Sequence, residues 1–442
     1  MEDAEKQVDC SSYRGPSIET GAYENLNRHS ALQPPNALLL PTDTKSPDGG
    51  WSGWLVVFGA FLALFCSFGQ MNAFGTYQSW YSDHQLSNHS QFSISWIGSL
   101  QLCTFFFMGG PVGRIFDAYG PTPVMIFGTL LLAFSTLMTS ISMEYYEFLL
   151  FQGFFFGLSV ASLFYPSLAA VSTYFDKYRA SALGVVAAGS GLGGVVYPIM
   201  LRQLFVRVTY PWAVRASALL SVACCIVSLF TVRQKGGKKC PGRIGVKTFK
   251  DASFLLLVTG SFFICLGLFT PFFYIVSYAE DRALVSEQTA FYVLSVMNAG
   301  GIFGRIVPAI LSDKIGRFNL LIPAAFLAGL SCLVFWMLAK TMIAVMTFAA
   351  VYGFLSGAFI SVITPCVAQI SDINEIGSRM GALYTLISLP SLVGGPIAGA
   401  LIQDQRGSYT AMIGVSGSTI IFGSLFILVC RFKMNRNICA RV

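Results

Sequence analysis

Arg305 is the residue best placed by type and position to bind a ligand, because it is the only charged residue well inside a long apolar segment. A guanidinium at that depth costs roughly several kcal/mol unless it meets water, a partner or a ligand. Its planar fork of donors can hold a carboxylate through two hydrogen bonds. We therefore expect Arg305 to bind an anion. The alternative is that it braces a gate beside Asp313, eight residues further on.

Uncharged polar residues in other apolar segments could complete such a site. Amides and phenols there either line a solute cavity or form hydrogen bonds between helices, and the sequence leaves both roles open. The candidate substrate-binding residues beside Arg305 are Gln70, Asn72, Gln101, Tyr165, Tyr274, Asn298 and Tyr384. No Asp, Glu or His lies at the middle of a segment. A coupling proton would thus have to use Asp117 or Asp313, and uniport or exchange is equally tenable.

Enzyme and metal chemistry have little support in the sequence. None of the three histidines, His29, His84 and His89, is expected to lie within a span, and the 11 cysteines show no spacing typical of metal ligands. Paired carboxylates and Ser/His groupings are also missing from the apolar segments. We expect no catalytic residues, no metal and no cofactor.

A glycine motif raises one further possibility, nucleotide binding. Gly189, Gly191 and Gly194 have the spacing G-x-G-x-x-G within AAGSGLGGVVYP. This motif holds a pyrophosphate only where it joins a strand to a helix. Here residues 180–201 carry no charge and are long enough to cross a bilayer. The glycines are therefore expected to let two helices pack closely.

The elements that must position these residues are membrane-spanning helices. Hydrophobic residues make up 54% of the chain, charged residues only 11%, and the mean hydropathy is +0.64. Runs such as GTLLLAFSTLM are apolar on every face, which excludes the alternating pattern of a β-barrel. We predict an all-α membrane protein with twelve transmembrane helices. The apolar windows are 49–82, 84–113, 118–143, 148–175, 180–201, 216–232, 252–279, 288–312, 318–339, 341–371, 380–403 and 407–430.

The spans divide into two related bundles of six. Asp117 and Gly120 in GRIFDAYGP match Asp313 and Gly316 in LSDKIGRF at an offset of 196 residues, and Tyr165-Pro166 matches Thr364-Pro365 at 199. Such a duplication is typical of carriers whose two halves tilt about a cavity at the midplane. The predicted parts are a disordered cytoplasmic tail (1–46), the first bundle (47–232), a basic cytoplasmic linker (233–250), the second bundle (251–431) and a cytoplasmic tail (432–442).

The short charged loops after spans two and eight are candidates for a cytoplasmic gate. A carboxylate there can cap a helix or pair with a basic residue in one state only, although a plain solvated turn is the alternative. The gate candidates are Asp117, Gly120, Asp313, Gly316 and Arg317.

The distribution of Lys and Arg places both termini on the cytoplasmic side. Asn88-His89-Ser90 then lies outside as a glycosylation acceptor, or is a chance tripeptide. The net charge is +7, and most of the basic residues are expected on one face of the membrane. We therefore expect contact with the lipid bilayer and none with nucleic acid.

With these features the chain resembles the major facilitator superfamily over roughly residues 47–432. The run PDGGWSGWLVVFGAF, residues 47–61, looks like the signature of the monocarboxylate transporter family, and SGLGGVVYPIM looks most like its fungal branch. The resemblance implies a solute-binding arginine at Arg305. The family's lysine and aspartate are replaced by Asn72 and Gly301. The fungal branch includes riboflavin carriers and metabolite exporters.

We therefore expect a secondary active or facilitative transporter of a small organic solute, a monocarboxylate or related anionic metabolite, working by alternating access. A riboflavin or secondary-metabolite exporter of the same fold is the alternative, and a membrane sensor that kept the fold is an alternative of another class. We expect a monomer in the plasma membrane, or else in the vacuolar membrane. The sequence leaves open the solute and the direction of transport.

Overall fold

The computed structural model describes residues 50–175, 178–234, 251–282, 287–371 and 376–435. In this part of the chain eleven helices are long and apolar enough to cross a membrane. A pair bent by 41°, α4 (Gln91–Phe107) with α5 (Gly109–Tyr119), supplies a twelfth crossing. The predicted all-helical fold with twelve spans is confirmed. The predicted tail 1–46, most of the linker 233–250 and most of the tail 432–442 lie outside the described residues.

The first six spans contain the shorter and more interrupted helices. Their remaining elements are α1 (Gly50–Cys66), α2 (Phe68–Met71), α3 (Phe74–Asp83), α6 (Pro121–Ile141), α7 (Tyr145–Phe148), the π-helical segment η2 (Leu149–Phe155), α8 (Phe156–Ser172), α9 (Arg179–Arg207) and α10 (Tyr210–Thr231).

The second six spans are formed by the helices of the second half. They are α11 (Ala252–Leu268), α12 (Thr270–Arg282), α13 (Glu287–Ile315), α14 (Arg317–Ser331) with the π-helical segment η4 (Cys332–Trp336), α15 (Met342–Gln369), α16 (Ile376–Asp404) and α17 (Thr410–Met434).

The first and seventh spans are broken near their middles, which the apolar windows did not indicate. Between α11 and α12 the cause is Pro271, which has no N–H to donate to the carbonyl of Gly267. That carbonyl instead accepts the Ser416 hydroxyl at 2.8 Å. In the first span, where α1 ends, the Ala63 carbonyl keeps its helical hydrogen bond from the Ser67 N–H at 3.1 Å and also accepts the Ser67 hydroxyl at 2.6 Å. At the break in the seventh span a side chain therefore satisfies a backbone group inside the membrane.

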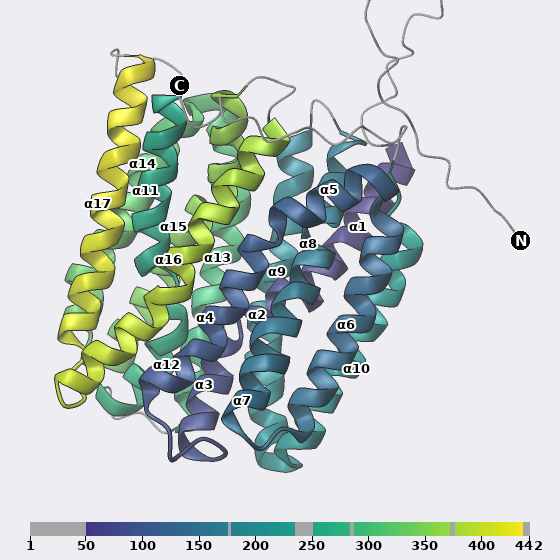
Figure 1. Ribbon diagram of the computed structural model, residues 1–442. Helices are drawn as coiled ribbons and strands as arrows, with labels where there is room; N and C mark the ends of the chain where they lie inside the picture. Colours follow the sequence, from purple (N-terminus) through teal and green to yellow (C-terminus); the bar gives the residue numbers. More distant parts are fainter. Residues whose placement is uncertain (1–49, 176–177, 235–250, 283–286, 372–375, 436–442) are drawn as a thin grey trace, which may run out of the picture. The chain divides into compact units, whose positions relative to one another are not determined.

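The two halves pack their helices by the same scheme. In the first half α1 packs on α9 and α10, and α6 packs on α8 and α10. In the second half α11 packs on α16 and α17, and α14 packs on α15 and α17. Figure 1 shows α11, α14 and α17 together along one edge, with α6 and α10 along the other. We call the end where α1 begins and α17 ends the upper end, and the end where α3 ends the lower end (Figure 1).

The halves meet through two long helix pairs, α9 with α13 and α4 with α16, and a shorter pair, α3 with α12. Small residues line these contacts: a Cβ on Gly191 would lie 2.5 Å from Ile302 Cγ1, and one on Gly110 would lie 3.9 Å from Gly381 Cα. At the lower end the Ser79 hydroxyl donates to the Glu280 carboxylate at 3.1 Å. Contacts between the halves therefore extend from one end of the bundle to the other.

The outer faces of the spans carry large apolar side chains in the open. Because a bilayer solvates such side chains, they mark the surface that faces lipid. Five that are largely exposed are Leu130, Leu219, Phe230, Leu338 and Ile343.

Candidate solute-binding site

Arg305 lies on α13 where this helix packs against α9 of the other half. Its side chain is 3% exposed. One guanidinium nitrogen, Nη1, donates to the Ser190 hydroxyl at 2.6 Å and to the Ala187 carbonyl at 3.4 Å. The guanidinium carbon is 5.9 Å from the centre of the Phe68 ring. Arg305 thus connects the two halves at the point where α2, α9 and α13 converge.

The charge of Arg305 is not matched by an opposite charge. No described carboxylate forms an ion pair with it, and its Nε has no hydrogen-bond partner. An ionised group buried in this way is destabilising unless a charged or strongly accepting group joins it. The arrangement can therefore bind an anionic oxygen.

Asn298 lies two helical turns from Arg305 on the same face of α13, roughly 10 Å away along the axis. Its Nδ2 donates to the Leu294 carbonyl at 3.0 Å, and its Oδ1, which has no partner, contacts Gly194 of α9. The side chain is 1% exposed. A buried acceptor of this kind can receive an N–H or O–H group from a solute.

A row of aromatic side chains leads from Phe68, which lies beside Arg305, to Tyr384 of the second half. The ring of Phe68 is 5.1 Å from that of Phe105, which stacks on Tyr165 at 5.3 Å. Tyr165 in turn is 5.6 Å from Tyr384 of the second half, whose hydroxyl is 2.9 Å from Thr364 Oγ1. This aromatic wall offers flat apolar surface next to a cation.

Two of the other predicted polar residues, Asn72 and Tyr274, lie at different sites in the structure. Asn72 joins Arg305 at Ser190, because its Nδ2 donates to the Ser190 carbonyl at 3.5 Å. Tyr274 instead donates to the Gly395 carbonyl at 2.9 Å within the second half. The structure therefore places Asn72 at the Arg305 site, whereas Tyr274 forms a hydrogen bond between two helices of the second half.

Gln70 and Gln101 line a small cavity inside the first half. Gln70 donates to Ser217 at 3.3 Å and accepts from Ser221 at 3.2 Å, whereas Oε1 of Gln101 has no partner. The cavity measures about 10 Å³, close to the volume of one water molecule, and Gln152 also lines it. It is too small for an organic solute.

Each loop predicted as part of a gate is a single glycine between two helices, and both glycines have a positive φ. Gly120 has φ +84° and Gly316 has φ +108°, a region that favours glycine, and each follows one helix and precedes the next. Arg317 donates to the Pro365 carbonyl at 3.1 Å. Asp117 lies in α5, and Asp313 lies in α13 with its side chain outside the described residues.

The three motif glycines lie on two faces of α9. A Cβ on Gly189 would contact the Phe61 carbonyl of α1, in the same half. Gly191 and Gly194 face Ile302 and Asn298 of α13, in the other half. The motif lies in the middle of a helix, where it has no strand before it to form a nucleotide-binding turn.

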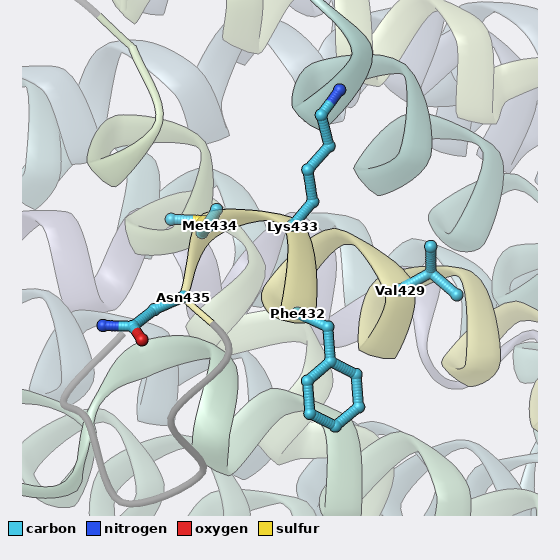
Figure 2. A pocket seen from close by; sticks show the side chains of 5 residues that line it. All are labelled: Val429, Phe432, Lys433, Met434 and Asn435. Carbon is cyan, nitrogen blue, oxygen red and sulfur yellow. The ribbon is translucent and has the colours of Figure 1, made fainter.

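Two features near the ends of the bundle stand apart from the site. Asn88 is exposed in the segment between α3 and α4 at the lower end. At the upper end a surface hollow is lined by Val429, Phe432, Lys433, Met434 and Asn435 of α17 and the residue after it. Figure 2 shows that the side chains of Lys433 and Asn435 point away from each other, so the polar groups do not converge on one ligand.

Sequence reasoning missed two residues that join the halves, Ser190 and Glu280. Ser190 is the only hydroxyl in the glycine-rich run AAGSGLGG, which could have signalled a polar contact on a packing face. Glu280 lies just past the apolar window 252–279, so the apolar pattern gave no indication that it lies at the contact between the halves. Its carboxylate faces Ser79 across the lower end of the interface.

A multi-pass membrane protein with two similarly packed halves and a buried cation between them has the construction of a secondary transporter. The family model of the Major Facilitator Superfamily matches residues 59–350, and the chain belongs to this superfamily of membrane transporters. It is 38% identical to MFS-type transporter 1 of Ophiocordyceps sp. (strain BCC 1869) over 394 residues, covering 88% of each chain.

Two further relatives have names that state what they export. The chain is 36% identical to the fujikurins efflux protein of Gibberella fujikuroi, covering 93% of this chain and 90% of the relative. It is 35% identical to the aspyridones efflux protein of Emericella nidulans, covering 91% and 83%.

Proposed function

We propose that the protein exports an acidic, aromatic secondary metabolite across the plasma membrane by alternating access. The observation that carries this is Arg305, a buried guanidinium between the halves with no described carboxylate partner and an unbonded Nε. The aromatic wall from Phe68 to Tyr384 supports a ring system beside the acid. The names of the relatives support export of a secondary metabolite rather than uptake of a small monocarboxylate.

A small monocarboxylate is the second candidate, supported by the same arginine and by the tryptophan-rich start of the first span. Trp54 packs edge-on against Phe175 at 5.5 Å, and Trp51 is 87% exposed. Tryptophans in such positions anchor a helix at the membrane interface. They support the resemblance to monocarboxylate transporters but contribute nothing to the Arg305 site.

In the proposed orientation the upper end faces the cytoplasm, and the loops that contain Gly120 and Gly316 form part of the inner gate. Asn88 then lies on the outer side as a glycan acceptor. The protein is proposed to act as a monomer.

Transport assays in proteoliposomes test the function. We expect purified protein to carry carboxyfluorescein, an acidic aromatic probe, faster than L-lactate or riboflavin. Arg305→Ala should lower the rate by about 10- to 100-fold, the effect of losing one or two hydrogen bonds to a charged group. Arg305→Lys should retain part of the rate, because it keeps the charge but loses the fork.

Arg207→Ala is the matched control, because Arg207 is exposed near the lower end of α9. It should transport at the wild-type rate. An Arg305→Ala protein that reaches the membrane and transports at full rate would contradict the anion site. Faster transport of L-lactate or of riboflavin would instead favour the corresponding alternative.

A further inference from the structure

Ser190 makes the shortest hydrogen bond that the structure shows for Arg305. Its hydroxyl donates to the Ala187 carbonyl at 2.6 Å, which directs an oxygen lone pair toward Nη1 of Arg305, also at 2.6 Å. Ser190 is 3% exposed, and it lies on α9 of the first half, whereas Arg305 lies on α13 of the second. The shortest polar contact of Arg305 is therefore made between the halves.

This contact solves a physical problem of the transport cycle. An empty carrier must close its two halves before it can open on the other side, and closure buries the cation of its binding site. A buried guanidinium without an acceptor opposes that closure. The Ser190 hydroxyl and the Ala187 carbonyl supply oxygen acceptors at the place where an anionic oxygen of the solute would otherwise bind.

We propose that Ser190 is a positioning residue that substitutes for the solute's anionic oxygen, so that the empty carrier closes and returns without a counter-solute. The proposal rests on the proposed function, in which Arg305 binds the anion. It makes the protein a net exporter rather than an obligatory exchanger. It also makes solute binding compete directly with the Ser190–Arg305 contact, because both require the same donors.

Cysteine labelling tests the contact without any solute. Ile302 faces Gly191 at the same interface, one turn before Arg305, so Ile302→Cys reports how often the halves separate. The probe is a membrane-impermeant methanethiosulfonate reagent, and protein with Ile302 intact gives the background from native cysteines. Adding Ser190→Ala should speed labelling by about tenfold, the population shift for one hydrogen bond to a charged group.

Ser190→Asp is the opposite variant, because a carboxylate in this position forms an ion pair with Arg305. It should slow labelling below the wild-type rate. Loss of packing alone would not move the two variants in opposite directions. Labelling at the wild-type rate in Ser190→Ala, or faster labelling in both variants, would overturn the proposal.

Transport gives the second readout. With carboxyfluorescein loaded inside, efflux from Ser190→Ala vesicles into probe-free buffer should fall several-fold. A non-fluorescent aromatic carboxylate outside should restore it, because a loaded carrier returns without Ser190. Equal loss in both conditions would contradict the proposal. If Arg305→Ala transports normally while Ser190→Ala still alters labelling, the anion-binding function fails but the contact between the halves stands.

Discussion

Some residues around Arg305 could be predicted from the sequence, and others could not. Arg305 was proposed as a site residue from its chemistry, because a charge deep in an apolar segment has few structural uses, and also from the family resemblance. Its partner Ser190 could not be predicted, since that required knowing which face of α9 meets α13. Gln70 and Gln101 have suitable chemistry, yet they line a separate cavity inside the first half. Residue type therefore predicted the donor, and helix packing determined which acceptors reach it.

The Asp251–Arg379 ion pair provides a test at the residue scale. Asp251 caps α11 by accepting from the Ser253 N–H at 2.9 Å, and Arg379 of α16 donates to it at 2.8 Å. Burial by itself raises the pKa of the Asp251 carboxyl, but these hydrogen bonds outweigh burial and leave the pKa below its ordinary value. The ionised form is thus favoured in the folded protein.

The sign of the pH effect follows from that lowered pKa. The stabilisation is fully present above the unfolded-state pKa of about 3.9 and is lost as pH falls through the lower folded-state pKa. We expect it to amount to about 1 kcal/mol at neutral pH, because solvent screens a partly exposed pair. Asp251→Asn should therefore lower Tm at pH 7 and have a much smaller effect near pH 2, where the carboxyl is largely protonated in both states. An equal loss at both pH values would show that the pair does not act through charge.

At the scale of elements, apolar windows predicted the spans well but not their limits or breaks. The sixth window began at 216 because Arg215 interrupted it, yet α10 begins at Tyr210. Arg215 is tolerated because its Nε donates to Ser140 at 3.2 Å and its guanidinium lies 5.2 Å from the Trp212 ring. At the break before Pro271 the Gly267 carbonyl accepts a hydrogen bond from the Ser416 hydroxyl, and these two residues are 149 positions apart in the chain.

The two glycine faces of α9 should have different functions. Gly189→Ala would force a methyl group against the Phe61 carbonyl of α1, so it should lower stability by roughly 1–3 kcal/mol. Gly191→Ala would press on the Ile302 side chain at the interface between the halves and should mainly disfavour their closure. Thermal unfolding in detergent measures the first effect, and labelling of an interface cysteine measures the second.

Gly414→Ala is the matched control for both substitutions. Gly414 lies inside α17, and a Cβ there would have no neighbour within 4 Å. Because alanine has a higher helix propensity than glycine, this variant should be as stable as the wild type or slightly more stable. A Gly189→Ala protein as stable as Gly414→Ala would contradict the close packing of α9 on α1.

For the whole molecule, the duplicated landmarks of the sequence correspond to matched structure. Gly120 and Gly316 both adopt positive φ at the start of a helix, and the two halves use the same packing partners. The halves contact each other at α9–α13 and α4–α16, with Arg305 buried between them. The sequence predicted the duplication, but it could not indicate that this conformation encloses the cation. Alternating access requires that these contacts open at one end at a time.

The most direct test of this account measures distances at both ends of the bundle by pulsed electron paramagnetic resonance. Spin labels at His84 and Arg282 report the lower end, and labels at Tyr119 and Lys314 report the upper end, all exposed positions on opposite halves. The account predicts that carboxyfluorescein lengthens the distance at one end while shortening it or leaving it unchanged at the other. Lengthening at both ends together, or no change at either end in a protein that transports, would contradict the tilting of two halves about Arg305.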